Sequence, residues 1–496
     1  MKVEHPGLEP FEASLRHLLE TAFNSGVKAI ESKGYRFEDI QRDRTAMSVF
    51  IRGCHYGYDR AQTRVGAAVI ALEKQIREKK EQLKEFRRLR NEGVSELLEM
   101  IKALEDRQLV MRRIIDTIVY SMLGEDEWII RRLGSGDEIR SIDPQVLERT
   151  LRVASARNEQ SRYTFAVVVD LSTSVQIGDL FEISFQPGEK RAWRILELKE
   201  GKVNALLSEI LGEKASLTEE DRISLQQRLD KSKMKQVERM VRQRTTLSQL
   251  EEVIETDHGI DYGTKQEITL SPDVIVVDDY EEDLCTLIEK SAREGHASKT
   301  IDECLHVIAV KPMQKLRPRA LVPLFHLLAH PGCLENQLSS EDLTKEWEAF
   351  AKNAPIIDLV DLSMRIPHGR PIFYWVLVSR LRQVDLAMGH IRLFAYFDIE
   401  AFLERVRLTG IKASWITGKE AHELKKVSRR IMGSPNAYGV RVEYANGNVQ
   451  DLMSGFFSRV LVYQTKPSSL LKMMRNLDQQ SEKIAMTRLR KKEKVN

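Results

Sequence analysis

The sequence predicts an α+β or α/β multidomain protein with a helical N-terminal region, a central mixed sheet flanked by helices and a C-terminal α/β domain. The chain has 496 residues, which is more than a single domain usually contains. Its apolar residues recur at helical spacing up to about residue 133, and β-rich runs begin at Thr164. We therefore expect three segments, which cover residues 1–140, 141–312 and 313–496.

The overall composition narrows the class of protein. Hydrophobic residues make up 42% and charged residues 30% of the chain, which is close to globular averages and argues against a disordered or fibrous protein. The 77 basic residues nearly balance the 74 acidic ones. Any surface that binds nucleic acid must therefore be local.

The cysteines and the apolar runs indicate the compartment. Four cysteines lie far apart without a C-x-x-C pair, which predicts reduced thiols and no zinc ribbon. The first residues contain no apolar signal core, and there is no run of about 18 apolar residues. We expect a cytoplasmic protein that has no membrane partner.

Segment 1–140 is predicted to be a helical arm that resembles a coiled coil. From about residue 62 to residue 90, an apolar stripe with Val69, Leu72 and Ile76 lies beside mixed charges, the pattern of an amphipathic helix. Residues 91–93 interrupt this pattern before a second helix follows, which favours an antiparallel helical hairpin. The hairpin would serve packing within the chain or the formation of a homodimer.

Segment 141–312 begins with a helix from about Pro144 to Arg157. The run 164–170 is apolar on both faces, as in a strand buried within a sheet. Runs 179–185 and 191–199 alternate in polarity and are separated by Pro187 and Gly188. These two runs therefore predict a β-hairpin.

Further along the chain, helical and strand patterns alternate. Helices are predicted at 218–255, 281–293 and 320–328, and strands at 267–270, 274–277, 305–310, 391–397 and 439–444. The boundary between the second and third segments is expected near Pro312. Residues 313–496 end in a basic tail, and they contain no motif that indicates their role.

Several common catalytic motifs are absent. The sequence has no G-x-x-x-x-G-K-[ST], H-E-x-x-H or G-x-S-x-G pattern, which argues against the commonest ATPases, metalloproteases and hydrolases. His326 and His330 have the i, i+4 spacing of metal ligands. Without a nearby carboxylate or thiol, we expect this pair to serve packing.

The predicted hairpin carries the residues that suggest chemistry. Asp179 begins its first strand, and Glu197 and Lys199 end its second strand on one face. Carboxylates on neighbouring strands can hold one hard cation such as Mg²⁺. The lysine could orient the attacking water and offset negative charge in the transition state.

This order of helix, strand, Gly178–Asp179 and Glu197-x-Lys199 resembles the PD-(D/E)xK nuclease superfamily, which includes restriction endonucleases and Holliday junction resolvases. The resemblance covers residues 141–311, with Gly178 at the position of the family's proline. It implies a restriction-endonuclease-like fold, Asp179 and Glu197 as ligands of Mg²⁺ or Mn²⁺, Lys199 as the catalytic lysine and DNA as the substrate. It also suggests a role in defence against foreign DNA, including antiviral defence, or in repair.

Two further features of the family have weaker counterparts in this chain. Glu148 is the candidate for a glutamate on the first core helix, and Gln236 for a polar residue on the helix after the lysine strand. That helix also carries a set of candidate DNA-binding residues: Lys231, Lys233, Lys235, Arg239, Arg242, Gln243 and Arg244. The connection between residues 203 and 219 is longer than the usual one in the family.

Other interpretations remain for the same residues. Glu197 and Lys199 could face solvent on an edge strand, and the basic helix could be an ordinary solvated surface. A degenerate nuclease fold could bind DNA without cutting it, or serve as a scaffold for a protein partner. A shared metal requires the Asp179 and Glu197 carboxylates to lie within about 6 Å of each other on one sheet face.

Overall fold

The computed structural model describes residues 11–90, 92–124, 129–133, 142–187, 191–198, 258–260, 267–269, 277–312, 318–330, 340–353, 356–366, 369–427, 431, 438–444 and 447–476, with isolated positions between 218 and 249. Contacts divide the chain into two compact units, Pro6–Val274 and Ile275–Asn496. This division falls inside the expected segment 141–312. The helical region and the predicted hairpin thus share the first unit.

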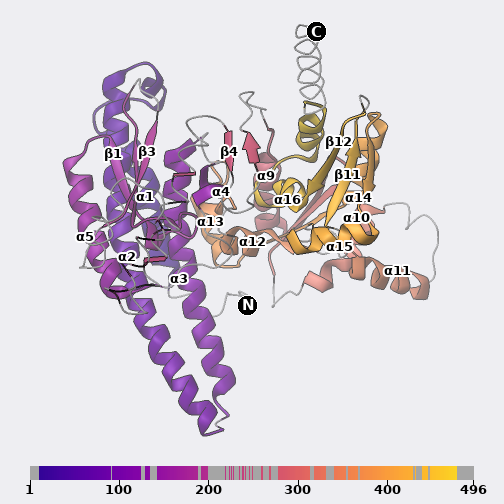
Figure 1. The fold of residues 1–496 in the computed structure, drawn as a ribbon, viewed down its shortest axis with the longest axis horizontal. Coiled ribbons are helices and arrows are strands. Elements are labelled where there is room, and N and C mark those ends of the chain that lie inside the picture. The colour runs from indigo at the N-terminus through magenta and orange to yellow at the C-terminus, as the bar shows by residue number, and fades with distance from the viewer. Residues whose placement is uncertain are drawn as a thin grey trace. The chain divides into compact units, whose positions relative to one another are not determined.

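Helices form the N-terminal part of the first unit, as expected (Figure 1). They are α1 (Glu12–Glu31), α2 (Arg44–Arg88) and α3 (Val94–Leu123). The carboxylate of Asp43 accepts hydrogen bonds from the amides of Thr45 and Ala46 and so caps the start of α2. At the outer end of the α2–α3 hairpin, Leu83 packs with Leu97 and Ile101. The expected helical hairpin is therefore present.

Glycines allow α1 and α2 to approach each other closely. A Cβ atom at Gly53 would lie 2.6 Å from Ala29 Cβ, and one at Gly57 would lie 2.5 Å from the Thr21 carbonyl oxygen. Real Cβ atoms do not come this close to their neighbours. The two backbones can therefore pack at this distance only because these positions lack side chains.

A three-stranded sheet follows the helices. After α5 (Pro144–Gln160), the strands β1 (Thr164–Val168), β2 (Leu180–Ser184) and β3 (Ala192–Leu196) lie in the order β1-β2-β3. Both pairings are antiparallel. The predicted hairpin is thus present as β2–β3, whereas a mixed sheet stays a prediction.

Side chains of two helices form hydrogen bonds with the backbone groups along the outer edge of β1. Gln62 of α2 donates to the Ala166 carbonyl at 3.1 Å and accepts from the Val168 amide at 2.9 Å. Asn158 of α5 accepts from the Ala166 amide at 2.7 Å. These amide side chains occupy the place of a neighbouring strand, so the edge is covered by helices.

The second unit is built on a four-stranded antiparallel sheet in the order β6-β7-β9-β8. The strands are β6 (His296–Ile301), β7 (Leu305–Val310), β8 (Ile357–Asp358) and β9 (Arg392–Phe397). Strand 305–310, which was expected in the central sheet, is thus β7, and it pairs with the C-terminal strand β9. A smaller sheet has the order β10-β11-β12, with β10 (Lys412–Trp415), β11 (Gly439–Glu443) and β12 (Val449–Met453).

Helices and buried aromatic rings complete this unit. The ring of Phe397 lies 5.7 Å from that of Phe402, which lies 6.3 Å from that of Phe457. The helices are α9 (Glu281–Glu294), α10 (Val322–Ala329), α11 (Ser340–Asn353), α12 (Leu359–Arg365), α13 (Arg380–Ala387), α14 (Ile399–Leu408), α15 (Gly418–Val427) and α16 (Ser454–Val462). In the described part of the chain, no helix combines the length and the apolar character needed to cross a membrane.

Candidate functional site

The open end of the β2–β3 hairpin brings together two of the predicted site residues. Leu180 pairs with Leu196 as the last pair of the ladder, and Asp179 and Glu197 adjoin this pair in the sequence. The Asp179 amide donates to the Leu196 carbonyl at 2.9 Å, and the Leu198 amide donates to Asp179 Oδ2 at 2.7 Å. Because the Leu198 nitrogen is bonded to the Glu197 carbonyl carbon, the Asp179 carboxylate lies against the peptide bond that follows Glu197.

The carboxylates of Asp179 and Glu197 are less exposed to solvent than those of most surface residues. Asp179 and Glu197 are both partly buried, and the Oε1 atom of Glu197 is shielded from solvent. A carboxylate removed from water needs hydrogen bonds or a cation to offset its desolvation. The Leu198 amide is one such hydrogen-bond donor to Asp179.

Gly178 fixes the direction from which Asp179 enters the strand. Its φ of +81° lies in the left-handed region, where residues with a side chain are disfavoured. A Cβ atom here would overlap the Cγ2 methyl of Ile195. Proline, with φ near −65°, cannot adopt this conformation, so this backbone favours glycine at position 178.

A buried polar cluster holds the loop that leads to Asp179. Asp116 of α3 accepts from Ser172 Oγ at 2.6 Å, from the Thr173 amide at 2.8 Å and from the Ser174 amide at 3.0 Å. It also accepts from Thr173 Oγ1 at 2.5 Å and pairs with Arg113 at 2.8 Å. The side chains of Arg113 and Asp116 are both fully buried. We call Arg113, Asp116, Ser172, Thr173 and Ser174 the buried clamp.

The buried clamp accounts for a loop that is unusually well shielded from solvent. Loops normally run over the surface, because their backbone polar groups need water. Here residues 171–178 are buried, and Asp116, the Ser172 hydroxyl and the Leu133 carbonyl supply partners for their amides. The clamp therefore positions the segment that ends at Asp179. Sequence reasoning missed it, although charged residues within the apolar run around Ile114 and Ile115 were a usable signal.

A second ion-pair group joins α5 to the hairpin. Glu182 of β2, whose side chain is 3% exposed, pairs with Arg157 of α5 and with Arg194 of β3. Burial alone would raise the pKa of Glu182. The hydrogen bonds and charges of the two arginines outweigh burial and hold that pKa below its usual range. This carboxylate therefore stabilises the packing of α5 on β2 and β3 in its ionised form.

Replacing Glu182 by glutamine should lower the free energy of unfolding by about 1–2 kcal/mol near pH 7, less than for a fully buried pair, because both arginines reach solvent. The folded-state pKa lies below the unfolded value of about 4.3. The ion pair thus stabilises the protein above that value, and this contribution disappears as the pH falls through the folded-state pKa. The stability difference between the native chain and Glu182→Gln, measured in urea, should shrink below about pH 4. A pH-independent difference would contradict the assignment.

Of the other predicted site residues, the structure describes only Glu148. Glu148 lies on the exposed face of α5, and its carboxylate is 3.9 Å from Arg152. Lys199 and Gln236 lie outside the described residues. The same holds for all the candidate DNA-binding residues of the basic helix, which are Lys231, Lys233, Lys235, Arg239, Arg242, Gln243 and Arg244.

The described residues do not contain a complete metal site built from protein side chains alone. Among these residues, no group of three or more His, Cys, Asp or Glu side chains is arranged to hold a metal ion. Mg²⁺, however, is commonly bound through one or two carboxylates, with waters and substrate phosphate completing the octahedron. Asp179 and Glu197 provide donor oxygens of the type that Mg²⁺ and Mn²⁺ prefer.

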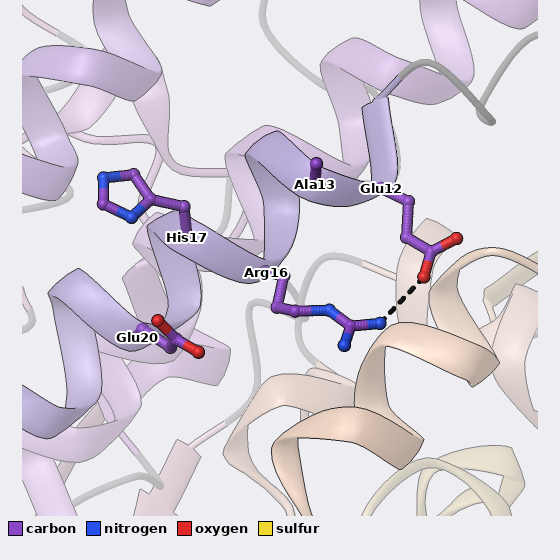
Figure 2. A pocket seen from close by; sticks show the side chains of 5 residues that line it. All are labelled: Glu12, Ala13, Arg16, His17 and Glu20. Carbon is purple, nitrogen blue, oxygen red and sulfur yellow. Dashed lines mark hydrogen bonds and ion pairs between the residues drawn. The ribbon is translucent and has the colours of Figure 1, made fainter.

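Each unit also contains a group of polar side chains outside the hairpin. In the second unit, His326 is buried against Phe350 and lies 3.6 Å from Glu346, so it has the nearby carboxylate that the sequence did not reveal. In the first unit, Figure 2 shows the side chains of α1 around a shallow hollow, in which Arg16 pairs with Glu12 at 2.8 Å. Its described lining comes from one helix and mixes both charges, which does not define a ligand.

Comparison with known proteins adds no support for the resemblance to the PD-(D/E)xK superfamily. No family model matches the chain, and no curated protein or solved structure matches it. The candidate site is therefore defined by its residues, namely Asp179, Glu197, the glycine before Asp179 and the buried clamp that positions them.

Proposed function

We propose that this chain is a nuclease that hydrolyses DNA phosphodiester bonds with a bound divalent metal ion, Mg²⁺ or Mn²⁺. The proposal is carried by the meeting of Asp179 and Glu197 at the end of the β2–β3 hairpin, where Asp179 accepts a hydrogen bond from the Leu198 amide. The order α5, β1, β2, β3 also agrees with the beginning of a restriction-endonuclease-like core. The proposal includes this fold for the central region.

Asp179 and Glu197 would hold the metal ion through carboxylate oxygens. When bound, the ion would polarise a phosphate oxygen and lower the pKa of a water molecule. The hydrogen bond from Leu198 restricts the rotation of the Asp179 side chain, and the buried clamp limits movement of its backbone. Such preorganisation reduces the rearrangement needed when substrate binds.

In the proposed reaction, the oxygen of water forms a bond to phosphorus while the bond to one sugar oxygen breaks. The proton released by water leaves to solvent or a basic group, and the departing sugar oxygen takes up a proton. Lys199 would stabilise the negative charge that develops on the phosphate, a role that its family resemblance implies. The basic helix would contact neighbouring phosphates.

We further propose that two copies act together through their N-terminal helices, because cutting both strands of a duplex needs two passes of one site or two sites. A cytoplasmic role in defence against foreign DNA or in repair follows from the resemblance. The alternative function is a non-catalytic DNA-binding or scaffold protein, in which the same hairpin serves only the fold. Only the nuclease would need a bound metal ion at Asp179 and Glu197, so a test for metal-dependent cleavage distinguishes it from the non-catalytic protein.

The test compares the native chain with Asp179→Asn and Glu197→Gln. Cleavage of linear, circular and branched DNA in Mg²⁺ should fall by about a hundredfold or more in each variant, because one metal ligand is lost. Calorimetric titration with Mn²⁺ should show binding to the native chain and loss of binding in the double variant. Glu99→Gln, which changes an exposed carboxylate on α3, should match the native chain in both assays.

The outcomes separate the two functions. Unchanged cleavage in both variants would refute the proposed site. DNA binding without cleavage, combined with no Mn²⁺ binding at Asp179 and Glu197, would favour the non-catalytic protein.

A further inference from the structure

A groove follows the line of contact between α1 and α2. It has a volume of about 570 Å³ and is lined by residues at helical spacing on both helices. Its lining includes Ala29 and Gly53, at one of the places where the two helices approach each other closely. Because these residues have little or no side chain, the groove stays open between the longer side chains on either side.

The charge along this groove is of one sign. Lys28, Lys33 and Arg52 line it, and all three are exposed. None of its described lining residues is acidic. Within the described part of the chain, none of these three cations forms an ion pair with a carboxylate. Lys28 lies in the last turn of α1, where a cation offsets the helix dipole, but Arg52 lies within α2 and has no such role.

An aromatic ring stands beside the cations. Tyr56 is 60% exposed and lines the same groove. Arg60 holds it in place by donating to its hydroxyl at 2.6 Å, with the guanidinium 5.5 Å from the ring centroid. A large aromatic side chain that is exposed and also oriented provides a surface on which a planar group can stack.

We infer that this groove binds a segment of single-stranded nucleic acid, with Tyr56 stacking on a base and Lys28, Lys33 and Arg52 contacting successive phosphates. Proteins that bind single strands combine a positively charged groove with aromatic platforms. A duplex would offer its phosphates but keep its bases stacked within the helix, so Tyr56 would have no partner. The inference goes beyond the proposed nuclease site, because the groove contains neither Asp179 nor Glu197 and needs no hydrolysis.

The test measures binding of the full-length chain to a fluorescently labelled oligothymidine by anisotropy in EDTA, so that failure of the nuclease proposal would not affect it. The triple variant Lys28→Glu, Lys33→Glu, Arg52→Glu should bind at least about tenfold more weakly. The slope of log affinity against log salt should also become smaller by about two, since each phosphate contact contributes about 0.7 for single strands.

Matched controls separate the groove from overall charge. The triple variant Lys74→Glu, Lys102→Glu, Lys419→Glu changes three exposed lysines elsewhere by the same total charge and should lose much less affinity. Tyr56→Ala should weaken binding about fivefold or more through lost stacking. Phe37→Ala, which removes another ring that is 60% exposed, should not. Circular dichroism would verify that each variant is folded.

Three results would overturn the inference. They are no binding by the native chain, equal losses in the two triple variants, and tighter binding of a duplex of the same length than of the single strand. Loss in the groove variant alone, together with the Tyr56→Ala effect, would support it.

Discussion

Replacing Asp116 by alanine should destabilise the first unit by about 3–5 kcal/mol, because the fully buried Arg113 loses the carboxylate with which it pairs at 2.8 Å. The substitution also removes the acceptor of hydrogen bonds from Ser172, Thr173 and Ser174. Each buried donor left without a partner adds a desolvation cost. Hydrogen exchange of peptides from β1 and β2 would measure the loss as a lower free energy of opening.

A matched control lies on the same helical hairpin. Glu81 and Lys84 form an ion pair at 2.7 Å with the same i, i+3 spacing as Arg113 and Asp116, but both side chains are more than 70% exposed. Glu81→Ala should change the opening free energy by less than about 1 kcal/mol. If Asp116→Ala were equally mild, the buried clamp would not be what holds the loop.

Helices and strands were predictable where the apolar residues of the sequence are also the buried residues of the structure. The apolar run 305–310 is β7, and the helix predicted over 281–293 is α9, Glu281–Glu294. Strand β6 was missed, because its sequence HASKTI contains no apolar run and only Ala297 and Ile301 are buried. It forms at the edge of the sheet through backbone pairing with β7. Tertiary pairing thus outweighs local propensity there.

The candidate site was predictable only where it follows from the pairing of neighbouring strands. The alternating runs 179–185 and 191–199 predict the β2–β3 pairing, and the pairing of Leu180 with Leu196 brings Asp179 close to Glu197. Asp116 could not be connected to this hairpin from the sequence, because its partners lie 56 or more residues away. Only the packing of α3 against the loop reveals that contact. Long-range polar contacts leave no periodic pattern in a sequence.

Gly178 should be the position of the candidate site least tolerant of substitution. With φ at +81°, proline would be forced out of its permitted conformation, and we expect Gly178→Pro to cost more than about 3 kcal/mol and to abolish Mn²⁺ binding at Asp179. Gly178→Ala should cost more than the roughly 1–2 kcal/mol of a left-handed alanine, because its Cβ would also overlap Ile195.

Gly34 separates the two contributions, because it has nearly the same φ of +80° but no atom within 4 Å of an added Cβ. Gly34→Ala should therefore show only the conformational cost, and the excess loss in Gly178→Ala measures the overlap with Ile195. Adding Ile195→Ala to Gly178→Ala should recover part of that excess, as a coupling energy between neighbours. Equal losses at Gly34 and Gly178, with no coupling to Ile195, would mean that the hairpin end can relax, and a relaxed end could not hold two carboxylates around one metal ion.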